Sequence, residues 1–265
     1  MILGCTRGAG QTITALMTGH ILAAVRGVPV AALDLNPGDG SLTSRRSAAG
    51  TVAALLAGEE LAGPGNAGPG NAGPGNVARP DRGDRGNRSA RLDVITGPAH
   101  PIESGDYQRL AALLAERYPL TLVDPAPAGL PRTLSAADQL VLVVPASPDA
   151  ASSLANTQQW LGAHGYAELA ARAVTVLNGV SRRTSEDVAQ AEAVARGRGR
   201  AIVRVPWDDL LTARPGTPAA VNPQTRVAYA ALAGVLITGL ADAAADADRD
   251  ADTDASGRNP GEHAD

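Results

Sequence analysis

A glycine-rich segment near the N-terminus has most parts of a phosphate-binding turn, but it lacks the usual cation. The segment GCTRGAGQT, Gly4 to Thr12, stands between a short apolar run and a helical pattern. In such turns backbone N–H groups at a helix N-terminus hold phosphate oxygens, a lysine contacts the outer phosphates, and a serine or threonine hydroxyl binds Mg²⁺. Gly8, Gly10 and Thr12 supply the first and third parts, and Gln11 stands where the lysine is expected. By itself, the segment is equally consistent with a structural turn.

Two aspartates follow apolar runs elsewhere in the chain. Asp34 lies in LDLNPGDGSLT and Asp124 in LTLVDPAPAG. A carboxylate beside a core is costly unless a metal, another positive group or a water network shares its pocket. Each aspartate alone is also explained as a helix cap or turn residue. Together with the glycine segment, the two favour a site that binds an anion and a metal.

These residues need a scaffold, and the order of elements predicts one. Apolar strand patterns alternate with helical patterns along the chain, which implies parallel pairing and right-handed crossovers. Ligands in such sheets bind at the carboxyl ends of the strands. We therefore predict one domain with a three-layer α/β/α fold and a mostly parallel sheet. The predicted strands are ILGC, VPVAALDL, ARLDVITG, LTLVDPAPAG, DQLVLVVPA, AVTVLNGV and AIVRVPW, and helices are predicted at residues 12–26, 47–61, 106–118, 149–165 and 227–245.

Two segments are predicted to lie outside this domain, which spans residues 1–241. Residues 63–91 contain a GPGNA repeat with a period of five and then an arginine-rich stretch, so we expect a flexible insertion. Residues 242–265 are rich in aspartate and nearly free of large apolar side chains, which predicts a disordered acidic tail. A calcium loop is a weaker alternative for the tail, because the central glycine and terminal glutamate of an EF-hand are missing.

The composition narrows the possible partners and compartment. The 265 residues carry a net charge of −4, which argues against a general nucleic-acid or anionic-membrane surface. One cysteine, Cys5, and no visible signal peptide favour a cytoplasmic location. The apolar helix at 227–245 is interpreted as a core helix rather than a membrane span. The scattered histidines lack the spacing of a zinc site. All 23 basic residues are arginines, so no lysine elsewhere can replace the missing one.

The order of motifs resembles the MinD/ParA-like P-loop ATPases, with the phrasing of divergent actinobacterial members, some of which accompany type VII secretion systems. The matching segments are CTRGAGQT, LDLNPGDGSLT, LVDPAPAG, ADQLVLVVPASPDAASSLANTQQWL, VTVLNGV and VPWDDLL. The resemblance implies a deviant Walker A loop, ATP or ADP with Mg²⁺, and a homodimer. It places Mg²⁺ at Thr12 and Asp124 and adenine at Asn178, and Trp207 is a candidate cover for the base. The implied nucleotide-binding residues are Arg7, Gly8, Ala9, Gly10, Gln11, Thr12, Ile13, Asp34, Asp124, Asn178 and Pro206.

The chain departs from this family at three charged positions. The lysine that reaches across the dimer corresponds to Thr6, the phosphate lysine to Gln11, and the hydrolytic aspartate to Asn36. A glutamine donates a neutral hydrogen bond but does not offset charge that develops on phosphoryl oxygens. An asparagine neither accepts a proton nor orients water as a carboxylate does. Arg7 is the one basic residue of the loop and could approach phosphates.

The sequence therefore predicts a protein that has lost ATP hydrolysis, or retains it very weakly, and that acts as a scaffold or regulatory partner in positioning or secretion. Weak nucleotide binding is compatible with this prediction. The alternative is an active ATP-dependent dimer switch that uses Arg7 and Gln11. A metabolic enzyme of the same fold would need further catalytic groups, which the sequence does not show. The acidic tail disfavours direct membrane insertion, so we expect membrane contact only through a protein partner.

Overall fold

The structure is a computed structural model. It describes residues 1–36, 38, 40–59, 61, 90–98, 100–212 and 217–256. The predicted insertion at 63–91 lies outside the described residues except for its last two positions.

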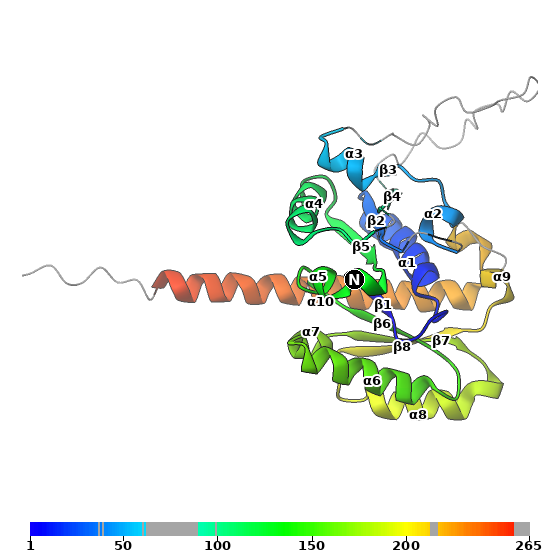
Figure 1. The fold of residues 1–265 in the computed structure, drawn as a ribbon. Helices are drawn as coiled ribbons and strands as arrows, with labels where there is room; N and C mark the ends of the chain where they lie inside the picture. Colours follow the sequence, from blue (N-terminus) through cyan, green and yellow to red (C-terminus); the bar gives the residue numbers. More distant parts are fainter. Residues whose placement is uncertain are drawn as a thin grey trace, which may run out of the picture.

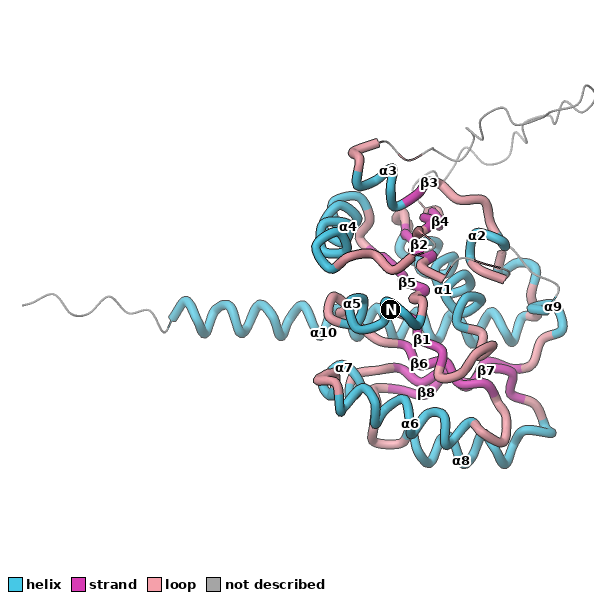
Figure 2. Tube along the Cα trace, in the orientation of Figure 1, coloured by secondary structure: helices cyan, strands magenta, loops and turns pink. Residues whose placement is uncertain are grey.

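The strands, drawn in magenta in Figure 2, form two four-stranded sheets. Every pairing in these sheets is parallel. This agrees with the predicted α/β class, because consecutive parallel strands are joined through helices. The first sheet has the order β1 (Ile2–Gly4), β6 (Val141–Pro145), β7 (Val174–Val180) and β8 (Ala201–Pro206). The second has the order β3 (Gly50–Thr51), β4 (Leu92–Thr96), β2 (Val30–Asp34) and β5 (Leu120–Asp124).

The two sheets meet at β1 and β5, which lie side by side without a backbone ladder (Figure 1). We call this boundary, between Ile2–Gly4 and Leu120–Asp124, the β1–β5 seam. A mostly parallel sheet is thus present, but it is divided at the seam.

Helices cover both faces of the strands, as expected for a three-layer fold (Figure 1). One face of both sheets packs against α1 and α10. The other face of the first sheet packs against α6 and α8, and that of the second against α3 and α4. The helices are α1 (Gln11–Arg26), α2 (Leu42–Arg45), α3 (Val52–Leu56), α4 (Ser104–Arg117), α5 (Leu130–Leu134), α6 (Ala150–Ala163), α7 (Ala167–Ala171), α8 (Ser185–Ala195), α9 (Asp209–Thr212) and α10 (Pro223–Ser256).

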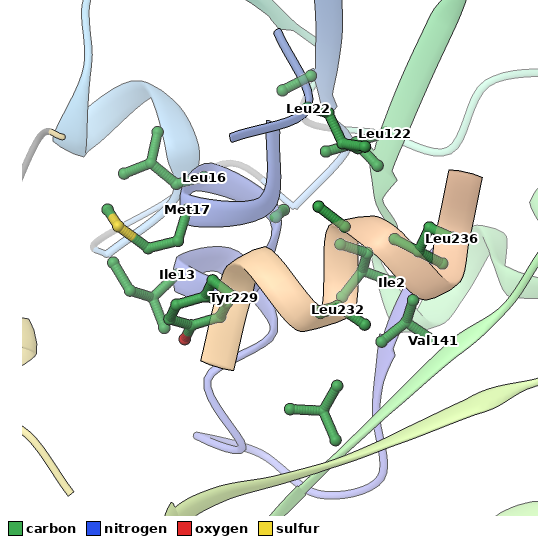
Figure 3. Packing of buried hydrophobic residues seen from close by; sticks show 14 of the residues in the cluster. Ile2, Ile13, Leu16, Met17, Leu22, Leu122, Val141, Tyr229, Leu232 and Leu236 are labelled. Atoms are coloured by element: carbon green, nitrogen blue, oxygen red, sulfur yellow. The ribbon is translucent and has the colours of Figure 1, made fainter. Parts of the chain in front are cut away.

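The central core lies where α1 and α10 cross the strands, and it is aliphatic because the chain has so few aromatic residues. Figure 3 shows Leu232 and Leu236 of α10 facing Ile2 and Val141 of the first sheet. Tyr229 is the largest fully buried side chain of the described residues. This packing fixes α1, and with it the glycine segment that precedes α1.

α10 contains a segment, Pro223–Ala243, with the length and mean hydropathy (1.4) of a membrane span. Core helices of soluble proteins also pass this test. Here Tyr229, Leu232 and Leu236 are buried against α1 and the first sheet. About 33% of this segment is buried, so the helix packs on the core through one stripe, and the interpretation as a core helix is supported for that stripe alone.

The prediction of a disordered tail from residue 242 is wrong for residues 242–256. α10 continues as a helix to Ser256 and extends beyond the body of the protein (Figure 1). The segment is rich in alanine, which has the highest intrinsic helix propensity and here outweighs repulsion among the aspartates. Residues 257–265 lie outside the described part.

The predicted helix at 47–61 is also wrong in part. Gly50–Thr51 form strand β3, and the helix is reduced to Val52–Leu56. Thr51 is extended, and its side-chain oxygen accepts a hydrogen bond from the Ala54 N–H at 3.1 Å. This cap favours a helix start after residue 51.

Candidate functional site

The glycine segment has the backbone conformation of an anion-binding loop. Gly8 and Gly10 have positive φ angles of 76° and 93°, which other residues adopt rarely. Gly10 caps α1, and a Cβ at Gly10 would collide with the side chain of Asn178. The first backbone N–H groups of α1, at Gln11, Thr12 and Ile13, have no partner within a helix. The loop thus presents the donors and helix terminus that favour a phosphate.

Gln11 does not extend from the loop; its carboxamide bridges the β1–β5 seam. Its Oε1 accepts a hydrogen bond from the Gly4 N–H at 2.6 Å. Its Nε2 donates to Asp124 Oδ1 and to the Pro125 carbonyl oxygen, the latter at 3.0 Å. A Cβ at position 4 would lie 3.2 Å from Gln11 Oε1 and 3.3 Å from the Ala9 side chain, which is a tight contact, so the glycine eases the approach of the carboxamide. The carboxamide therefore replaces missing backbone pairing at this end of the seam.

Asp124 accepts hydrogen bonds on both of its carboxylate oxygens. Thr12 Oγ1 donates to Asp124 Oδ2 at 2.7 Å, and Gln11 donates to Oδ1. Burial raises the pKa of Asp124 to about 6, the two donors lower it, and the nearby Asp34 raises it. No cation offsets this burial among the described residues. The carboxylate thus occupies an environment that would favour a positive charge beside it.

Asp34 neighbours Asp124 in the sheet but serves a different segment. It is fully buried, and its Oδ2 accepts hydrogen bonds from Thr43 N at 3.0 Å and Thr43 Oγ1 at 2.9 Å. Its Oδ1 accepts from the Asn36 N–H at 3.3 Å. Asp34 thus fixes the turn that leads to α2. The Asn36 side chain is exposed and lines a small cavity of about 180 Å³ together with Arg132 and His100.

The residues predicted near adenine lie at the ends of β7 and β8. Asn178 donates through Nδ2 to the Ala9 carbonyl oxygen at 2.9 Å, so it braces the glycine loop from the opposite side. Pro206 ends β8. Trp207 lies beside Gly179 and is 60% exposed, and its Nε1 donates to Asp209 Oδ1 at 2.9 Å. Base recognition by Asn178 stays a prediction.

The remaining predicted loop residues divide into exposed and buried ones. Arg7 and Gly8 are exposed, and no other atom lies within 4 Å of a Cβ built at Gly8. Thr6 is half-buried, and its carbonyl oxygen accepts from the Ala9 N–H at 3.3 Å. Ala9 is buried in the core, as is the Ile13 side chain, so Ile13 offers a ligand its backbone N–H alone.

The residues of this site are suited to bind some groups of a magnesium nucleotide but not all of them. The loop backbone suits a phosphate, and the Thr12 hydroxyl and Asp124 carboxylate are oxygen donors of the kind that Mg²⁺ prefers. A bound Mg²⁺ would supply the positive charge that the buried Asp124 lacks. The outer phosphates would find no lysine, since Gln11 is neutral and engaged with Gly4 and Asp124.

Comparison with known proteins places this loop in a recognised architecture. A chain of the MinC:MinD cell division protein complex of Aquifex aeolicus superposes with a TM-score of 0.63 and 16% identity, covering 88% of this chain and 93% of that one. A ParA family ATPase of Chlorobium tepidum gives a TM-score of 0.61 and 20% identity, covering 88% and 96%. This chain has the MinD/ParA fold. The fold predicted from the motif order is thereby confirmed.

A distant relative is found by sequence, although no family model matches the chain. Over 225 residues, the chain is 28% identical to the ESX-1 secretion-associated protein EspI of Mycobacterium tuberculosis. The alignment covers 78% of this chain and 31% of EspI, so the chain spans about a third of the length of that relative. The similarity to a secretion-associated protein agrees with the resemblance seen in the motifs.

The sequence predicted the loop and both aspartates but not the residues that form hydrogen bonds with them. Gly4, Pro125 and Thr43 each bond to a predicted site residue through a backbone group. Backbone donors and acceptors carry no residue-type signal. Gly4 gives only a weak indication, because a side chain there would make contacts that are tight but not forbidden.

Proposed function

We propose that this chain is a MinD/ParA-fold protein that has lost ATP hydrolysis, binds ATP or ADP weakly, and acts as a scaffold or regulatory partner. One observation carries the proposal: the Gln11 carboxamide is engaged inside the protein, by Gly4 on one side and by Asp124 and Pro125 on the other. To contact a phosphate, Gln11 would have to break these hydrogen bonds, and it would still supply no charge.

The other two positions support the same proposal. Thr6 and Asn36 stand where the resemblance implies a second lysine and the hydrolytic aspartate. Phosphoryl transfer depends on electrostatic stabilisation and positioning, so the joint loss of three charged groups removes the main contributions.

The relative EspI supports a role in secretion. It is described as secretion-associated, and we extend that setting to this chain as a proposal. We further propose that the protein is cytoplasmic, that it meets a membrane only through a protein partner, and that any homodimer is independent of hydrolysis. The aspartates in the C-terminal part of α10 would be repelled by anionic lipid.

Nucleotide titration and turnover measurements test the proposal. We expect wild-type protein to show weak magnesium-dependent ATP binding and no turnover above a Gln11→Ala variant. A Gln11→Lys, Asn36→Asp variant should bind ATP at least about tenfold more tightly, because a charge-assisted bond replaces a neutral one.

A matched control carries the same charge changes far from the loop. Gln190 of α8 and Asn156 of α6 are exposed, so Gln190→Lys, Asn156→Asp should leave ATP affinity unchanged. Wild-type turnover at rates typical of MinD/ParA ATPases, abolished by Asp124→Asn, would contradict the loss of hydrolysis.

The alternative, an active ATP-dependent dimer switch, is favoured by one observation. The Arg7 side chain is exposed beside the open space at Gly8, where a phosphate or a second protomer could reach it. This alternative predicts dimerisation with ATP but not with ADP, lost in Arg7→Gln. Light scattering that gives one unchanged mass with ATP, ADP and no nucleotide would exclude the switch.

A further inference from the structure

A cavity of about 500 Å³ lies along the β1–β5 seam, away from the glycine loop. Its walls include Met1 and Ile2 at the start of β1, all of β5 except its last residue, and Val141 at the start of β6. Arg26, the last residue of α1, also lines it. The cavity therefore lies toward the amino ends of the strands, whereas the glycine loop lies at their carboxyl ends.

The cavity follows from the separation of two strands rather than from a missing side chain. Met1 O accepts a hydrogen bond from Val141 N, and Val143 O accepts one from Cys5 N. The backbone groups of the odd-numbered residues of this segment therefore bond to β6, and the backbone N–H and C=O of Ile2 face the seam. On the other side, Asp124 O accepts from Leu35 N, so Thr121 and Val123 of β5 face the seam in the same way. A change of rotamer alone would not close such a gap.

The walls are largely aliphatic, although Tyr107, Tyr118, Thr121, Thr133 and Gln139 also line the cavity. The volume lies within the range of small-molecule sites in proteins. An empty cavity is destabilising in proportion to its volume, and the aliphatic part of the wall gives water few hydrogen-bond partners. An apolar occupant is therefore favoured over water. The lining includes Leu22, Leu33, Leu110, Leu114, Leu122 and Leu236.

The length of the cavity and the charge at its rim further restrict the class of ligand that it can bind. The wall formed by β5 is about 13 Å long at the usual rise per residue, which suits an extended chain of about ten carbons. Arg26 is exposed, and no carboxylate of the described residues pairs with it. Asp138 lies at the rim too, among the residues before β6.

We propose that this cavity binds one linear alkyl chain with an anionic head, such as a free medium-chain fatty acid, with the chain along β5 and the carboxylate at Arg26. The proposal is independent of the function proposed for the nucleotide loop. It requires neither ATP nor hydrolysis.

Calorimetric titration with dodecanoate, below its micelle concentration, tests this site. We expect saturable binding with one dodecanoate per chain. Ala111→Trp places an indole into the cavity from α4 and should weaken binding at least tenfold. Ala112→Trp is the matched control, because Ala112 is exposed and does not line the cavity; its affinity should stay within twofold of wild type.

A second pair of variants tests the head group. Arg26→Gln should weaken dodecanoate binding about fivefold or more and leave the binding of dodecanol, which has no charge, unchanged. Arg117→Gln on α4 is the control, since Arg117 is exposed and outside the lining. Circular dichroism and the thermal midpoint verify that each variant is folded. The proposal is overturned if wild type binds only above the micelle concentration, if Ala111→Trp binds like wild type, or if Arg26→Gln affects both ligands equally.

Discussion

Asp124 and Asp208 are both buried carboxylates at the carboxyl ends of strands, yet their surroundings differ. Asp208 follows β8. Among the described residues, it accepts hydrogen bonds from Leu210 N at 3.0 Å, Asn222 N at 2.9 Å, Asn222 Nδ2 at 2.8 Å and Thr225 Oγ1 at 2.7 Å. Burial opposes its ionisation, but the donors from Thr225, Asn222 and Leu210 outweigh burial and lower its pKa. Asp124 accepts from two side chains, and burial raises its pKa to about 6.

This difference separates a structural carboxylate from one that lacks a partner. Asp208 ties the start of α10 to the end of β8, and its hydrogen-bond donors stabilise its charge against burial. Asp124 retains an uncompensated charge beside a loop suited to a phosphate. An aspartate destabilised in this way indicates a binding site. This difference favours Asp124 over Asp208 as a candidate metal ligand.

The largest predicted effect comes from the same substitution at each aspartate. Asp208→Asn should destabilise the fold by about 3 kcal/mol, because an amide nitrogen would face donors that now bond to a carboxylate. Asp124→Asn should change stability by about 1 kcal/mol or less, because removing a charge that burial penalises offsets the loss of hydrogen bonds. Urea unfolding at pH 7 measures both.

Equal losses of unfolding free energy in Asp124→Asn and Asp208→Asn would contradict this prediction. The far-UV spectrum of Asp208→Asn in the absence of urea serves as the control for a folded starting state. An equal loss would mean that Asp124 is as well compensated as Asp208.

The pH dependence of the unfolding free energy should distinguish Asp124 from Asp208. The pKa of Asp124 is raised from its ordinary 3.8 to about 6, so between these values the native state binds more protons than the unfolded state. Stability from this group is therefore full below about pH 4 and falls as pH rises toward 6, by about 2 kcal/mol. The contribution of Asp208 to stability has the opposite pH dependence. Because its pKa is lowered in the native state, this contribution is present above its ordinary pKa of 3.8 and is lost as the pH falls below that value.

Urea unfolding of wild type and Asp124→Asn from pH 4 to pH 7 isolates the first contribution. The difference between the two curves should decline between pH 4 and 6 and then level off. A difference that stays flat would show that Asp124 is compensated by a group not recognised in the structure.

The sequence predicted the fold and the loop because both depend on residue type. Alternating strand and helix patterns led to the parallel α/β class, and Gly8, Gly10 and Thr12 identified the turn. The division of the sheet was not predictable, since β1 and β5 have ordinary strand sequences and their separation depends on tertiary packing. The position of Gln11 was missed for a related reason: its partners at Gly4 and Pro125 are backbone atoms.

The tail shows a different limit of sequence reasoning. Seven aspartates after residue 241 suggested charge repulsion and disorder, whereas α10 continues to Ser256. The alanines between them carry a helix propensity that the charge pattern obscured. Helix continuation from a packed core also avoids the cost of starting a new helix.

The smallest predicted effect compares the threonine donors of the two carboxylates at pH 5, where Asp208 is ionised and Asp124 is mostly protonated. Thr225→Val removes a buried hydrogen bond to a charged group and should cost about 2 kcal/mol. Thr12→Val removes a bond to a largely neutral carboxyl and should cost about 1 kcal/mol or less. Both substitutions keep nearly the same shape, so the difference measures the charge of the acceptor. Raising the pH to 7.5 should increase the cost at Thr12 and leave the cost at Thr225 unchanged, because only Asp124 ionises over that interval; equal costs at both pH values would assign Asp124 an ordinary pKa.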